Sequence, residues 1–111
     1  MKRILLVALA IAACAFSSGQ GTATIVSTGI AVQLSTATPP IKATGCTITA
    51  NSVNAATIYV GFNSSVTSSN GTPLTAGSNY ACMPVGNTAF WSIGEFWVTG
   101  TSGDGVRYTW K

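Results

Sequence analysis

Few residues of this chain could carry acid–base chemistry. It has no histidine, five Lys and Arg, and two Asp and Glu among its 111 residues. Histidine is the usual proton carrier near neutral pH, and general acid–base catalysis needs such a group. The two carboxylates, Glu95 and Asp104, lie in an aromatic strand and a Gly-rich turn, which is unlike the tuned pair of a glycosidase. We therefore expect a non-enzymatic protein without catalytic residues.

Three cysteines, Cys14, Cys46 and Cys82, are the other reactive side chains. If Cys14 belongs to a leader, an exported Cys46 and Cys82 would form a disulfide, worth roughly 4 kcal/mol in the chain-entropy model. The alternative is a pair of unpaired buried thiols. Two cysteines and two distant carboxylates do not supply the four ligands of a metal site. We expect no metal and no cofactor.

The N-terminus has the pattern of an export signal. Two cations precede an apolar run over residues 4–16, which is too short to span a bilayer. We assign residues 1–16 to a signal peptide or lipoprotein signal, the alternative being a buried N-terminal element. Ala13-Cys14-Ala15 fits ordinary cleavage, whereas residues 11–14 resemble a lipobox that would make Cys14 a lipidation site. Any membrane contact would come through this leader or a lipid on Cys14.

Charge is scarce in the rest of the chain. Without the leader, the chain has three cations (Lys42, Arg107 and Lys111) and two carboxylates (Glu95 and Asp104), so its formal charge falls from +3 to +1. Nucleic-acid binding through phosphate contacts needs a basic patch, which is missing here. We expect no nucleic-acid partner.

The pattern after the leader is that of β-structure. Residues 17–22 are predicted to be a linker, and residues 23–111 a single domain rich in Thr, Val, Ile and aromatics, punctuated by Gly, Asn and Pro. Asn70-Gly71 is a strong hairpin signal. We expect an all-β, antiparallel sandwich or jelly-roll-like domain of about seven or eight short strands. The candidate strands cover residues 23–27, 30–35, 46–50, 57–63, 79–85, 90–93, 95–99 and 106–110.

Two pairs of adjacent aromatics stand out near the C-terminus. Neighbouring residues of a strand point to opposite faces, so Phe90 with Trp91, and Phe96 with Trp97, should each send one ring outward. These four residues are candidates for an interface with another subunit or a ligand. The alternative is that a second sheet or a loop covers them.

Six stretches of the chain combine strand and turn motifs. In order, they are Val26-Ser-Thr-Gly-Ile-Ala-Val-Gln-Leu34, Cys46-Thr-Ile-Thr-Ala50, Ile58-Tyr-Val-Gly61, Ser69-Asn-Gly-Thr-Pro-Leu74, Pro84-Val85 and Gly103-Asp-Gly-Val-Arg-Tyr108. Together they resemble small structural proteins encoded among tailed-phage genes. The resemblance implies a β-sandwich that decorates a phage head or forms a fibre-like virion component. The partner would then be further copies of the chain or a larger protein shell.

Two other functions remain open. The chain could be an exported subunit of an extracellular filament or coat, in which residues 23–34 pair with a sheet edge of the next subunit by β-strand addition. It could also be a periplasmic or lipid-anchored carbohydrate-binding domain, with an exposed ring such as that of Trp97 stacking on sugar. The expected location is the cell exterior or surface, or a virion.

Overall fold

The computed structural model describes residues 18–38, 40–82 and 91–111. The expected signal over residues 1–16, Cys14 and Phe90 therefore lie outside the described residues. The described part contains ten strands and one 3₁₀ turn: β1 (Gly19–Thr24), β2 (Val32–Gln33), β3 (Lys42–Ala43), β4 (Cys46–Ala50), β5 (Ile58–Gly61), β6 (Thr72–Leu74), β7 (Asn79–Cys82), β8 (Trp91–Ser92), η2 (Ile93–Glu95), β9 (Trp97–Thr99) and β10 (Gly105–Trp110).

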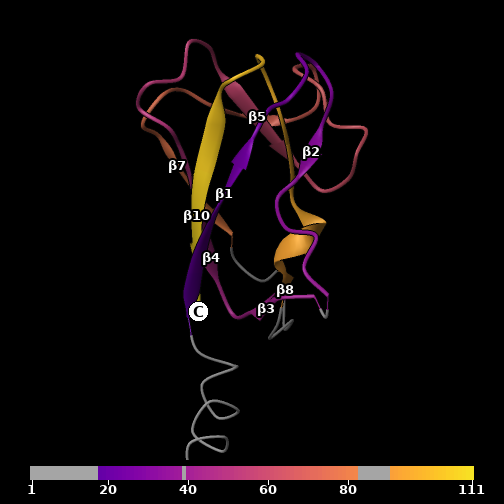
Figure 1. Ribbon diagram of the computed structural model, residues 1–111, viewed down its shortest axis with the longest axis vertical. Coiled ribbons are helices and arrows are strands. Elements are labelled where there is room, and N and C mark those ends of the chain that lie inside the picture. The colour runs from indigo at the N-terminus through magenta and orange to yellow at the C-terminus, as the bar shows by residue number, and fades with distance from the viewer. Residues whose placement is uncertain (1–17, 39, 83–90) are drawn as a thin grey trace, which may run out of the picture.

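The strands form two antiparallel layers, as Figure 1 shows. Sheet A has the order β1-β10-β4-β7, and sheet B has the order β2-β9-β5-β6. A short pair, β3 with β8, forms a third, two-stranded sheet. The prediction of an all-β sandwich is confirmed.

The core lies between the two sheets and is supplied by alternate residues of each strand. In β4, Cys46, Ile48 and Ala50 are buried, while Thr47 and Thr49 point to the other face. This alternation is what a sheet with one face in the core requires. The largest fully buried side chains come from both sheets and their connections: Phe96, Ile25, Ile48, Ile58, Ile93, Val98, Val106 and Cys82.

The disulfide prediction is confirmed. Cys46 of β4 and Cys82 of β7 are direct partners in the antiparallel register, and their sulfur atoms are bonded, with Cα atoms 4.8 Å apart. The bridge joins an inner strand of sheet A to its edge strand.

The structure corrects the expected linker. Residues 19–22 belong to β1, which pairs along its whole length with β10, from Gly19 opposite Trp110 to Thr24 opposite Gly105. Gly19 and Gly21 give β1 no apolar side chain in this stretch. Instead, a Cβ atom on Gly21 would lie 2.5 Å from the ring of Tyr108, and one on Gly19 would overlap the ring of Trp110. The last strand therefore covers the first with its aromatic rings.

Two large apolar side chains within the predicted strands 30–35 and 57–63 are exposed, and one expected turn differs. Ile30 is 64 % exposed and Phe62 is 58 % exposed. Asn70-Gly71 lies in the connection from β5 to β6, but neither residue has the positive φ that a two-residue type I′ hairpin requires. Instead, the Asn70 side chain accepts a hydrogen bond from Thr67 N and donates one to Ser65 O.

Candidate functional site

The outer face of sheet A carries an ordered set of polar side chains. Strand register places Thr22, Arg107, Thr49 and Asn79 in one row across β1, β10, β4 and β7. A second row contains Gln20, Thr109 and Thr47. We call these seven residues the hydroxyl face.

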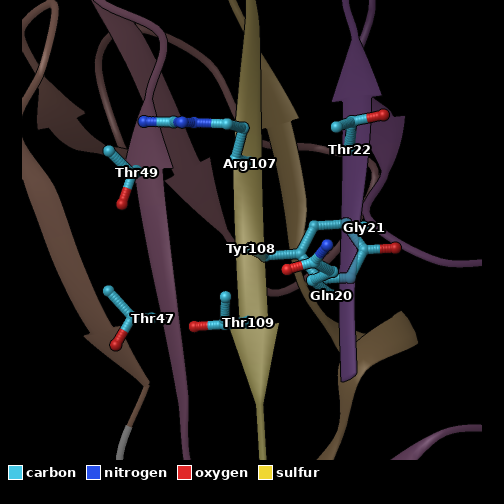
Figure 2. A pocket seen from close by; sticks show the side chains of 8 residues that line it. All are labelled: Gln20, Gly21, Thr22, Thr47, Thr49, Arg107, Tyr108 and Thr109. Carbon is cyan, nitrogen blue, oxygen red and sulfur yellow. The ribbon is translucent and has the colours of Figure 1, made fainter. Parts of the chain in front are cut away.

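A shallow hollow of about 540 Å³ lies on this face. Figure 2 shows Thr47 and Thr49 along β4, with Arg107 and Thr109 on β10. The Tyr108 ring extends from β10 to Gly21, where the missing side chain of β1 leaves room for it. The polar side chains that line the hollow point outward, whereas the Tyr108 ring and Gly21 belong to the core-facing rows of the same strands.

The groups of the hydroxyl face donate and accept hydrogen bonds. The Thr49 hydroxyl donates to the Asn79 side-chain oxygen at 2.7 Å. Arg107 is exposed, and no salt bridge joins it to another described residue. Within the described ranges, no three His, Cys, Asp or Glu side chains gather as metal ligands would. The chemistry available on this face is that of a polar contact surface carrying a single positive charge.

A second hollow, of about 460 Å³, lies over sheet B. Its lining includes the half-buried Tyr59 and a set of hydroxyls from Thr28, Thr57, Thr67, Ser68, Thr99 and Thr101. The Thr99 hydroxyl has no hydrogen-bond partner among the described residues, but it is also closed to solvent. Uncharged groups of this kind can hydrogen-bond a hydroxylated molecule.

Of the four aromatic residues expected at an interface, the structure describes the side chains of Phe96 and Trp97. Phe96 is completely buried and packs against Phe62 and Tyr80, with ring centroids 5.4 and 6.3 Å away. It is therefore a core residue. Trp97, its neighbour, is half-buried on the opposite face of β9. Trp91 lies in β8.

Asp104 has a structural role that the sequence around it does not reveal. Its side chain is only 6 % exposed, and its two carboxylate oxygens accept hydrogen bonds from Ala55 N and Ala56 N, each at 2.9 Å. Next to it, the Asn54 side chain exchanges two hydrogen bonds with the backbone of Gly105. These bonds fasten the connection between β4 and β5 to the start of β10. The Gly-Asp-Gly signal indicates the turn but not this long-range contact.

The free edges of the two sheets differ in how well they are protected against pairing with a strand of another chain. In sheet B, β6 contains Pro73, which has no N–H to offer, and β2 has only two residues. In sheet A, β1 has six residues, without proline or charge. The other edge strand, β7, has four residues and leads into residues 83–90, which are not described. Thus β1 is the longest edge strand in the described part, and it lacks the usual protection.

Comparison of the chain with protein-family models, with curated proteins and with solved structures returned no match. No helix among the described residues is long and apolar enough to cross a membrane.

Proposed function

We propose that this protein is a non-enzymatic structural subunit that assembles with copies of itself. The observation that carries the proposal is that β1 is an edge strand of sheet A, whose outer side pairs with no other described strand. An unpaired strand edge is a template for another strand, and natural proteins usually block it with proline, charge or a short length. None of these devices is present in β1.

The composition supports the same function. The hydroxyl face contains one charged residue, and the chain has few charges to repel another copy. Exposed apolar side chains, among them Val26, Ile30 and Val53, add surface that association can bury.

The assembly would be a phage virion, as decoration or fibre, or an extracellular filament or coat. The Cys46–Cys82 disulfide favours an exported subunit, because such bonds persist in oxidising surroundings. In either setting the partner is protein, and the protein needs no cofactor.

Sedimentation of the purified protein over a wide range of concentration tests self-assembly, and negative-stain microscopy gives the shape of any larger species. We expect association that persists at high salt, because screening weakens contacts between exposed charges but not backbone pairing. A sample that stays monomeric at every concentration and salt level would contradict the proposal. Assembly that disappears at high salt would instead indicate a charge-driven contact through residues such as Arg107.

A further inference from the structure

The backbone groups on the free side of β1 can be identified from the hydrogen bonds at its end. Ile25 N donates to Asp104 O at 2.8 Å, whereas Asn51 N donates to the next carbonyl, Gly105 O, at 3.0 Å. Successive residues of β10 thus bond alternately to β1 and to β4, as an antiparallel sheet requires.

The continuous register extends this alternation along β1. Gly19, Gly21 and Ala23 bond to β10, so the N–H and C=O groups of Gln20, Thr22 and Thr24 point away from it. No described residue forms a hydrogen bond with these outward backbone groups. Their side chains are exposed and uncharged.

We propose that two copies of the chain pair through their β1 edges, antiparallel, with Thr22 on the two-fold axis. This inference rests on the proposed function and specifies its first contact. Gln20 would bond to the second copy's Thr24, Thr22 to the second copy's Thr22, and Thr24 to the second copy's Gln20. The three residue pairs exchange about six backbone hydrogen bonds, because each bonded pair of an antiparallel ladder makes two.

The register centred on Thr22 is favoured because it uses all three outward residues within the limits of β1. Centring the axis on Gly21 would instead pair Thr24 with Ser18, which lies before the strand. The Thr22 register also places two threonines directly opposite each other on the outer face, a favourable cross-strand pair. The two four-stranded sheets become one sheet of eight strands, and their hydroxyl faces become continuous.

This contact closes on itself, because both copies use the same surface. It therefore makes a dimer, and any larger assembly must use a second surface.

The test replaces Thr22 with proline and measures the dimer dissociation constant by sedimentation. Thr22→Pro removes the central N–H donor without removing a bond to β10, so the constant should rise at least about tenfold. Thr22→Val is the matched control, since it keeps the N–H group and should leave the constant within about twofold. Equal association of all three proteins would overturn the β1 contact while leaving self-assembly intact.

Amide hydrogen exchange of the wild-type protein gives an answer even if Thr22→Pro does not fold. The Thr22 and Thr24 amides should become more protected as the protein concentration rises. The Gln33 amide is the internal control, because β2 is also an edge and the bond from Leu34 N to Phe96 O directs Gln33 away from β9. Association without any change at Thr22 and Thr24 would refute this contact, and a protein that never associates would refute the proposed function itself.

Discussion

At the scale of single residues, Asp104 joins two distant parts of the chain. Its buried carboxylate accepts backbone hydrogen bonds from Ala55 and Ala56, 49 and 48 positions away. Hydrogen bonds to a charged group are worth about 1.5–3 kcal/mol. We expect Asp104→Ala to lower the free energy of unfolding by about 2 kcal/mol in urea titrations, because both hydrogen bonds are lost. The loss should not be larger, because the N–H groups of the exposed Ala55 and Ala56 can still bond to water.

Glu95 provides the matched control for this prediction. It is the chain's other carboxylate, and it is exposed, accepting a 3.2 Å hydrogen bond from Ser92 N at the 3₁₀ turn. Glu95→Ala should therefore have a much smaller effect. Equal losses for the two variants would show that the Asp104 contact is not the source of the stability.

The sequence predicted the turn at Asp104 because Gly and Asp act locally, whereas the partner at Ala55 depends on the tertiary fold.

At the scale of elements, local pattern determined which strands could be predicted. The strand at Cys46–Ala50 was predicted with its observed bounds, because buried and outward residues alternate along it. The first half of β1 was missed, because its inward positions are Gly19 and Gly21 and show no such alternation. What buries this part of β1 are rings from β10, at the other end of the chain. The hydroxyl face was missed for the same reason, since its rows appear only once strand order is known.

Gly21 tests this packing of rings on β1. A side chain there would meet the Tyr108 ring at 2.5 Å, so Gly21→Val must displace it. Overpacking of this kind typically costs about 1–3 kcal/mol, and we expect a loss in that range in urea unfolding. Thr22→Val, the adjacent exposed position, should change the stability by less than about 0.5 kcal/mol. A Gly21→Val protein as stable as the wild type would mean that Tyr108 can leave β1 at no cost.

At the scale of the whole molecule, the disulfide fastens one edge of sheet A and leaves the unprotected edge without a covalent link. The order β1-β10-β4-β7 places the bridge on the side of β4 opposite to β1. The edge strand β7 is therefore covalently linked to sheet A. The other edge strand, β1, is held only by backbone hydrogen bonds to β10 and by the rings of Tyr108 and Trp110. The disulfide therefore adds no covalent restraint to β1, the edge that we propose pairs with a second copy.

The Cys46→Ala, Cys82→Ala double variant measures what the bridge contributes. The two cysteines are 36 positions apart, and closing a loop of this size restricts the unfolded chain by about 4 kcal/mol. We expect the double variant to lose about 2–4 kcal/mol of unfolding free energy in urea, with no further loss on adding reductant. The wild-type protein with reductant should approach the same value. Unchanged stability of the double variant would show that burial and strand pairing alone hold β7 on the sheet.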